Sequence, residues 1–249
     1  DHWRNDQEEN QLQIQLTFLS QIGHKPRMTH DKILIIDFGS QVTQLIARRL
    51  RSHNVYCEIR PCTIKPEEIR AFGAKGVILS GGPASVHEEA APDVSPSVFE
   101  LGVPVLGICY GQQLMCAKLG GAVHPAHERE FGRAEVSIVA DSELFKEVWS
   151  TGAQATVWMS HGDRVESIPQ GFSVIAKTAA APYAAIADEK RKFYAVQFHP
   201  EVAHTPDGSA LLKNFTHRIC GCKGDWTMAL FHREEMDIIR KKVGDRRVV

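Results

Sequence analysis

From Lys32 onward, apolar residues gather in short continuous runs, and stretches with a helical spacing of apolar residues separate these runs. The first four runs span residues 33–36, 55–59, 76–79 and 103–108. Short apolar runs that alternate with amphipathic helices are typical of βαβ units, whose parallel strands are buried on both faces. The pattern therefore predicts an α/β protein with three layers, in which an open, mostly parallel sheet carries helices on both faces.

The pattern changes after Gly121, where shorter apolar runs are separated by turn residues. These runs span residues 136–139, 156–159, 173–176, 184–186 and 194–198. They indicate further strands, some of them antiparallel or at an edge of the sheet. Helical spacing then predicts one helix over residues 208–219 and another over residues 226–243.

Both ends of the chain differ from this central unit. Residues 1–27 are rich in Gln, Asn and Glu, and a cluster of structure-breaking residues separates them from Met28. We expect them to be a disordered or added extension ahead of a domain that spans residues 28–220. Residues 221–249 are predicted to be a linker and the first helix of a further domain.

Composition and charge exclude several classes of protein. The 249 residues are 43% hydrophobic, and the formal net charge is -1, so no basic field attracts nucleic acid or an anionic membrane. The basic runs at residues 48–51 and 240–242 are short, and we expect them to be solvated helix faces. No stretch approaches the roughly 18 apolar residues of a membrane span. Six cysteines are too few for a disulfide scaffold, which favours a cytoplasmic protein with reduced thiols.

The sharpest candidate for chemistry is Gly107-Ile108-Cys109-Tyr110-Gly111, where the fourth apolar run meets a helix. Its spacing is that of the G-x-S-x-G nucleophile elbow, with Cys109 in place of serine. A tight turn from strand to helix lifts the nucleophile out of the sheet, and the helix N-terminus favours a thiolate. The backbone N–H that follows the nucleophile would face a developing oxyanion.

Two further motifs follow apolar runs. In His199-Pro200-Glu201, Pro200 favours an extended His199, so that the side chains of His199 and Glu201 face one side. A carboxylate that holds one imidazole nitrogen leaves the other free for acid–base work, although this tripeptide alone is more typical of a surface turn. The loop Ser80-Gly81-Gly82-Pro83 exposes backbone N–H groups that could bind phosphate, complete an oxyanion hole or form a plain turn.

A metal site has little support in the sequence. His161, His199, Glu201 and His204 carry ligand atoms, but no H-E-x-x-H or comparable spacing connects them. Neither of the two candidate cysteine pairs has the spacing of a zinc site. We therefore predict no metal.

Together, the three motifs resemble those of the class I (triad) glutamine amidotransferases. The resemblance covers roughly residues 32–219, and the motifs follow strand ends in the order that the family has. It implies a flavodoxin-like fold of the class I glutamine amidotransferase type. It also implies hydrolysis of the side-chain amide of glutamine through a cysteine thioester, which gives glutamate and ammonia.

The resemblance further implies a role for each residue. Cys109 would be the nucleophile, His199 the acid and base, and Glu201 the residue that orients His199. The backbone N–H groups of Gly82 and Tyr110 would hold the oxyanion. The positions that would help to hold glutamine are Gln113, Ser160 and His161.

The tail from Cys220 to Trp226 resembles the passage of one family member into an ATP pyrophosphatase (synthetase) domain of the same polypeptide. That domain would bind ATP and Mg²⁺ and use the ammonia to aminate a purine nucleotide. The resemblance implies that the full-length protein is a homodimer. No cofactor is predicted within this chain.

Two other classes of function stay open at this point. A cysteine hydrolase of the same fold would cleave a peptide or γ-glutamyl bond, and release of ammonia from free glutamine separates it from a glutaminase. A non-enzymatic, flavodoxin-like binding or regulatory module would leave Cys109 inert toward a glutamine-mimicking electrophile.

Overall fold

A computed structural model of the chain describes residues 30–244 and residue 246, apart from the side chains of residues 126–129. The described chain divides into two units, one of residues 31–227 and one that contains helix α6 (Met228–Val243). Helix α6 confirms the helix predicted near the C-terminus. The prediction for residues 1–27 lies outside the described residues. The domain boundary at residues 220 and 221 stays a prediction.

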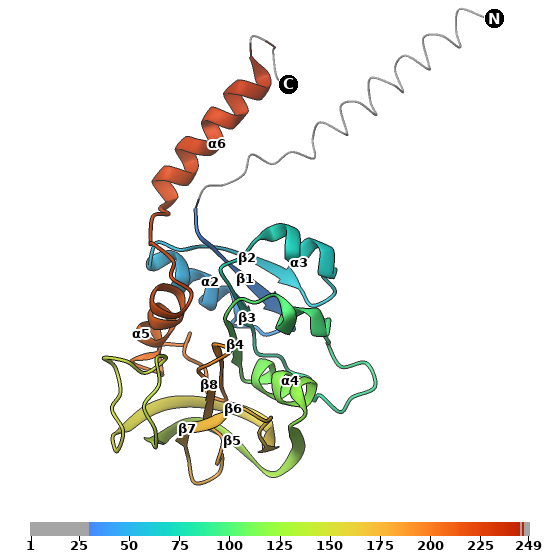
Figure 1. Cartoon of the computed structure of the whole chain (residues 1–249), viewed down its shortest axis with the longest axis vertical. Coiled ribbons are helices and arrows are strands. Elements are labelled where there is room, and N and C mark those ends of the chain that lie inside the picture. Colours follow the sequence, from blue (N-terminus) through green and yellow to red (C-terminus); the bar gives the residue numbers. More distant parts are fainter. Residues whose placement is uncertain (1–29, 245, 247–249) are drawn as a thin grey trace, which may run out of the picture. The chain divides into compact units, whose positions relative to one another are not determined.

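A sheet of nine strands runs through the unit of residues 31–227 (Figure 1). The strands are β1 (Lys32–Asp37), β2 (Tyr56–Pro61), β3 (Gly76–Leu79), β4 (Val105–Ile108), β5 (Ala122–Ile138), β6 (Gln154–Ser167), β7 (Ser173–Lys177), β8 (Ala185–Asp188) and β9 (Phe193–Val196). Their order is β2-β1-β3-β4-β9-β8-β7-β5-β6. The first five strands in this order pair in parallel, and the pairings from β9 to β6 are antiparallel.

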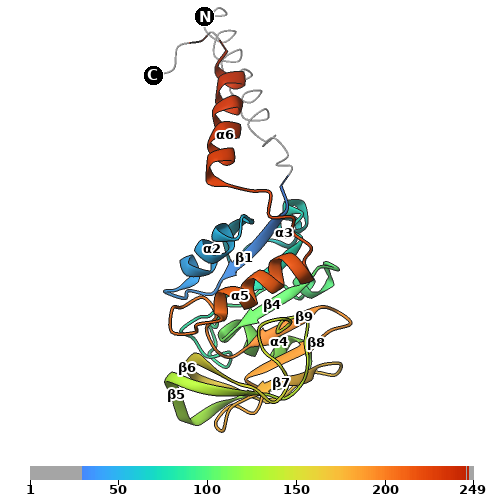
Figure 2. The same cartoon turned by 90° about the vertical axis from the view of Figure 1, so that its left-hand side faces the viewer.

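Helices cover both faces of the parallel half, as Figures 1 and 2 show. They are α2 (Thr43–Ser52), α3 (Pro66–Phe72), η1 (Pro96–Glu100), α4 (Tyr110–Leu119), α5 (Gly208–Lys213) and the π-helix η2 (Asn214–Ile219). Ile33 and Ile35 of β1 pack in one core with α2, α5 and η2, whereas Leu34 and Ile36 pack in the other core with α3, η1 and α4. Because successive strand residues point to opposite faces, a strand covered on both sides is apolar throughout. This arrangement confirms the three layers and the helix predicted over residues 208–219.

The antiparallel half differs most from the sequence-based prediction. The runs at 136–139 and 156–159 belong to β5 and β6, which have 17 and 14 residues and form one long hairpin. The outer part of this hairpin extends beyond the core, and Phe131 within it is 63% exposed. The apolar runs therefore mark only the section of each strand that is buried.

The parallel strands place the three sequence motifs at one edge of the sheet. Ser80 directly follows β3, Cys109 directly follows β4, and His199 comes three residues after β9. The order β2-β1-β3-β4-β9 is that of flavodoxin-like sheets, in which ligands bind beyond the carboxyl ends of the strands. The fold itself therefore points to this edge as the place for a site.

None of the described helices is long and apolar enough to span a membrane. All six cysteines belong to the described part of the chain, and each is a free thiol.

Candidate active site

Cys109 occupies a strained turn between β4 and α4. Its φ is 52° and its ψ is −107°, a conformation that residues with a Cβ atom rarely adopt. The backbone N–H of Cys109 donates to the carbonyl oxygen of Val196 (2.8 Å), which extends the pairing of β4 with β9 by one step. The residue is only 4% exposed, so the sulfur lies at the base of a depression and is not displayed on the surface.

Both glycines of the elbow occupy positions that leave no space for a Cβ atom. A Cβ atom on Gly107 would lie 2.6 Å from the carbonyl oxygen of Gly111. A Cβ atom on Gly111 would lie 2.4 Å from the carbonyl oxygen of Leu79 in β3. Strand β4 and helix α4 therefore approach each other at a distance that only glycine allows. Helix α4 approaches strand β3 equally closely.

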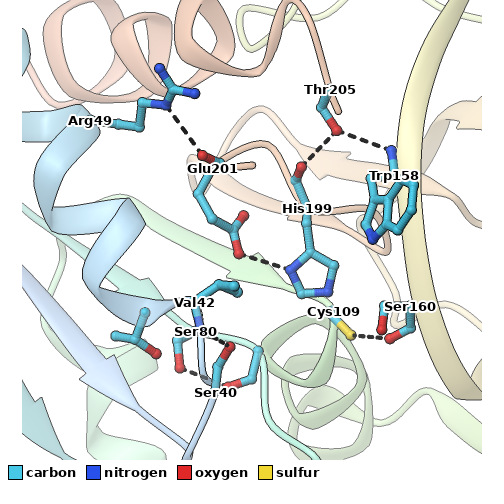
Figure 3. A network of polar contacts seen from close by, with 12 residues as sticks. Ser40, Val42, Arg49, Ser80, Cys109, Trp158, Ser160, His199, Glu201 and Thr205 are labelled. Carbon is cyan, nitrogen blue, oxygen red and sulfur yellow. Dashed lines mark hydrogen bonds and ion pairs between the residues drawn. The ribbon is translucent and has the colours of Figure 1, made fainter. Parts of the chain in front are cut away.

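His199 is held by one side-chain contact and two backbone hydrogen bonds, and Figure 3 shows those to Glu201 and Thr205. Its Nδ1 lies 2.8 Å from Oε1 of Glu201, and both residues are buried. Its backbone N–H donates to the carbonyl oxygen of Trp158 (3.0 Å), and its own carbonyl oxygen accepts from the hydroxyl of Thr205 (2.7 Å). Arg49 Nε in turn donates to the carbonyl oxygen of Glu201 (3.2 Å). The ring therefore has a fixed orientation, with Nε2 directed away from Glu201.

The surroundings of His199 favour its charged form. Burial disfavours the imidazolium, but the hydrogen bonds and the negative charges of Cys109 and Glu201 outweigh burial and raise the pKa of His199 well above its ordinary value. The native state thus holds this proton more tightly than the unfolded chain does. The resulting stabilisation is complete at pH values below about 6.5 and is lost as the pH rises through the raised pKa.

Of the two residues predicted for an oxyanion hole, Tyr110 follows Cys109 in the chain and Gly82 lines both cavities with it. Tyr110 begins α4, and the N–H of a first helical residue has no acceptor within its own helix. Gly82 follows β3 and lies against Phe38, so closely that a Cβ atom would meet the carbonyl oxygen of Phe38 at 2.7 Å. Ser80 stabilises this approach, because its hydroxyl oxygen accepts from the N–H of Phe38 (3.1 Å).

Two cavities meet at Cys109, a larger one of about 420 Å³ and a smaller one of about 270 Å³. The residues that line both are Gly82, Pro83, Cys109 and Ser160. The larger cavity alone is lined by Ala84, Ser85, Glu88, Gln113, Phe131, His161, Gly162 and Asp163. The smaller cavity alone is lined by Gly39, Ser40, Gln41, Val42, Trp158, His199 and Val202. The predicted glutamine-holding residues therefore gather at the larger cavity, and the predicted acid and base lies in the smaller one.

The residues of the larger cavity are tied to one another. Gln113 Nε2 donates to the carbonyl oxygen of Asp163 (2.9 Å). His161 Nδ1 lies 3.0 Å from the same carbonyl oxygen, and its Nε2 lies 3.2 Å from Oε2 of Glu130, directly across the β5–β6 hairpin. Both ring nitrogens of His161 are thus occupied by the protein, so the ring shapes the wall of the cavity. The carbonyl oxygen of Ser160 lies 3.5 Å from Cys109 Sγ.

Several residues of the site are not visible to sequence reasoning. The basic run at residues 48–51 was expected on a solvated helix face. Arg48 and Arg51 are exposed as expected, but the side chain of Arg49 reaches the carbonyl oxygen of Glu201. Thr205 gives no sequence signal. Asp163 lies two residues after His161, and its Oδ2 is buried with no hydrogen-bond partner among the described residues. A buried polar atom without a partner calls for an explanation, and a bound ligand group is one such explanation.

The described residues contain no ligand set for a metal. Within the ranges that the structure describes, no group of three or more His, Cys, Asp or Glu side chains is arranged to hold a metal ion. His204 stacks on the indole ring of Trp158, with ring centroids 4.4 Å apart.

This fold and this elbow are those of the glutaminases that use a cysteine, and comparison with known proteins agrees. The sequence profile of the family described as glutamine amidotransferase class-I matches residues 34–219. The chain therefore belongs to the class I glutamine amidotransferases, which confirms the family and the α/β fold expected from the motifs.

Its relatives are more specific. The chain is 55% identical over 226 residues to a GMP synthase (glutamine-hydrolyzing) of Rhizobium etli, a match that covers 89% of this chain and 44% of the relative. It is 57% identical over 219 residues to the GMP synthase (glutamine-hydrolyzing) of Brucella melitensis biotype 1, a match that covers 88% of this chain and 43% of that relative. The chain thus spans less than half the length of these curated relatives.

Solved structures give the same picture. A protein of Thermoplasma acidophilum described as a GMP synthase subunit superposes with a TM-score of 0.67 at 30% identity, covering 85% of this chain and 100% of that chain. A glutamine amidotransferase of Thermotoga maritima shares the fold, with a TM-score of 0.59 at 20% identity, covering 77% of this chain and 98% of that one.

The close approach at Gly111 predicts a specific loss of stability. We expect Gly111→Ala to lower the free energy of unfolding by about 3 kcal/mol or more, because the methyl group would displace the backbone of Leu79. The control is Gly102→Ala, where φ is +71° but no atom lies within 4 Å. Backbone strain alone should cost that variant about 1 kcal/mol. Urea unfolding measures both, and equal losses would contradict the steric argument.

The contact between Glu201 and His199 predicts how the pKa of His199 changes when the carboxylate is removed. In Glu201→Gln, the pKa of His199 should fall toward its ordinary value, because the negative charge that stabilises the imidazolium is gone. Glu135→Gln, which removes an exposed carboxylate of β5, should leave the His199 midpoint where it is. NMR titration of the His199 Cε1–H signal measures both variants. An unchanged midpoint in Glu201→Gln would show that the carboxylate only fills space.

Proposed function

We propose that this chain is the glutaminase part of a GMP synthase. It hydrolyses the side-chain amide of glutamine, and the ammonia serves to aminate XMP to GMP. The glutaminase proposal is carried by Cys109 at the junction of the two cavities, with His199 in the smaller one and Glu201 paired to His199 behind it. The identity to two GMP synthases, and the resemblance of residues 35–41, 159–163 and 196–202 to that enzyme, support the second step.

The proposed reaction uses each of these residues in turn. The sulfur of Cys109 attacks the amide carbon of glutamine as a thiolate, with the His199 imidazolium as its partner. The backbone N–H groups of Gly82 and Tyr110 stabilise the oxyanion of the tetrahedral intermediate. His199 gives its proton to the departing nitrogen, so that ammonia and a γ-glutamyl thioester form. His199 then takes a proton from water, which attacks the thioester and releases glutamate. Glu201 keeps Nε2 of His199 directed at the reacting atoms.

Glutamine lies in the larger cavity in this proposal. Its two backbone charges need partners of opposite charge or good hydrogen bonds when they leave water. The carboxylate of Asp163 takes the α-ammonium group, since one of its oxygens is buried without a partner among the described residues. Gln113 and Ser160 hold the remainder of the substrate. His161 acts indirectly, because its pairing with Glu130 and with the Asp163 carbonyl group fixes the wall behind the substrate.

The synthetase half of the reaction belongs to another domain. The loop Ser80-Gly81-Gly82-Pro83 lacks the S-G-G-x-D-S sequence of a pyrophosphatase phosphate loop, and Gly82 lines the same cavity as Cys109. ATP and Mg²⁺ are therefore assigned to an ATP pyrophosphatase domain of the same polypeptide. A cytoplasmic homodimer is the full-length form that accompanies this proposal.

Loss of the nucleophile should abolish the reaction. We expect Cys109→Ala to lower ammonia release from glutamine by about 1,000-fold or more. It should also prevent covalent labelling by a glutamine-mimicking electrophile. Cys116→Ala is the matched control, because this cysteine lies in helix α4 and burial raises the pKa of its thiol to about 12. It should keep both activities.

Ammonia assays and intact-protein mass spectrometry measure these effects. Undiminished activity in Cys109→Ala would contradict the proposal. Cleavage of γ-glutamyl peptides without release of ammonia from glutamine would favour the alternative cysteine hydrolase.

The role of Asp163 predicts a change in substrate binding. We expect Asp163→Asn to raise KM for glutamine by about 10- to 100-fold with kcat little changed, because a charge-assisted hydrogen bond contributes about 1.5–3 kcal/mol. The control is Glu166→Gln, three residues further along β6, whose carboxylate pairs with His124 on the surface. Steady-state kinetics separate the two parameters. An unchanged KM in Asp163→Asn would place the α-ammonium group elsewhere.

A further inference from the structure

Gln197 lies between β9 and His199, and the proposed reaction gives it no role. It is only 2% exposed, and it is not among the residues that line either cavity. Its backbone N–H donates to the carbonyl oxygen of Ala184 (2.8 Å). Its side-chain Oε1 lies 3.3 Å from Nε2 of Gln113 in helix α4. The residue therefore joins the end of β9 to a side chain that lines the larger cavity.

The chemistry of the partners determines which atoms of the two glutamines meet. The backbone carbonyl oxygen of Asp163 can only accept a hydrogen bond, so the atom of Gln113 that lies 2.9 Å from it must be Nε2. The same Nε2 faces Gln197, which must therefore present its oxygen. One contact would leave the amide free to turn, whereas two fix its plane. With Nε2 engaged twice, Oε1 is the polar atom of Gln113 that remains for a ligand.

The polar side chain of Gln197 is not explained by packing. In this orientation its Nε2 is buried and has no hydrogen-bond partner among the described residues. A buried donor without a partner lowers the free energy of unfolding, and a methionine would fill a similar space without this loss. Residues that break the rules of a stable core in this way are expected at functional sites. The contact with Gln113 supplies such a reason for glutamine at this position.

We infer that Gln197 is a positioning residue of the substrate site, which acts through Gln113. It holds the amide of Gln113 so that Oε1 accepts from an N–H group of the glutamine in the larger cavity. The inference rests on the proposed glutaminase function. One short segment then serves both parts of the site, because Val196 accepts from the backbone of Cys109, Gln197 holds Gln113, and His199 is the acid and base.

The variant Gln197→Met tests this role, because it keeps the length of the side chain and removes the acceptor. We expect KM for glutamine to rise about three- to tenfold with kcat little changed, which is the effect of losing one hydrogen bond. The midpoint of urea unfolding should stay the same or rise, since the unpartnered Nε2 is lost as well. A merely structural role would instead lower the midpoint and leave KM unchanged, because KM does not depend on the fraction of folded protein.

Two further variants complete the kinetic test. Gln112→Met is the matched control, because this neighbouring residue of α4 is also buried and its Nε2 donates elsewhere, to the carbonyl oxygen of Tyr183 (2.8 Å). It should leave KM unchanged. Gln113→Met removes the side chain through which Gln197 acts, so Gln197→Met should raise KM no further in that background. Additive increases in the double variant would overturn the route through Gln113.

NMR tests the contact without turnover. The side-chain amide signals of Gln113, identified by their absence in Gln113→Met, should shift in Gln197→Met and stay in place in Gln112→Met. Unchanged Gln113 signals, or an unchanged KM, in Gln197→Met would overturn the positioning role and leave the glutaminase intact. No release of ammonia from glutamine by the unaltered 249-residue chain would overturn the proposed function, and with it the role of Gln197 in binding glutamine.

Discussion

The hydrogen bond from the backbone N–H of Cys109 to the carbonyl oxygen of Val196 is the interaction on which the rest of the site depends. It is the last step of the β4–β9 pairing, and it fixes Cys109 relative to a residue only three positions before His199. The relative position of Cys109 and His199 is therefore set by strand pairing and does not depend on long loops. The positive φ of Cys109 is therefore tolerated, because pairing on one side and α4 on the other determine the backbone.

Close contact between backbone segments reinforces this arrangement on both sides of the site. On the nucleophile side, Gly111 lies against Leu79 at a distance that excludes any Cβ atom. On the histidine side, a Cβ atom on Gly208 at the start of α5 would lie 2.0 Å from the carbonyl oxygen of Pro200. The loop that carries His199 and Glu201 is thus packed directly on a helix end. Thr205 and Arg49 then donate to the carbonyl groups of His199 and Glu201 in this loop.

The sequence allowed the parallel half and the motif positions to be predicted for one physical reason. Strands buried on both faces must be apolar throughout, so the run at 33–36 and its counterparts are visible without knowledge of their partners. The outer part of the β5–β6 hairpin is exposed and lacks this signal, which is why both strands are longer than predicted. The contact of Arg49 with Glu201 joins residues 152 positions apart, and no local pattern encodes it. The same holds for the division into two cavities, which exists only once several strand ends meet.

That division gives the two sides of the sulfur different linings, because Glu88 and Asp163 line the larger cavity and no carboxylate of the described residues lines the smaller one. A zwitterionic amino acid requires charged or polar partners, and these line the larger cavity. The smaller cavity is lined by His199 and Cys109 and by no carboxylate of the described part of the chain, so the predicted acid and base lies apart from the acidic side chains of the larger cavity. The strand ends thus divide the surroundings of the sulfur into an acidic side and a side that holds the histidine.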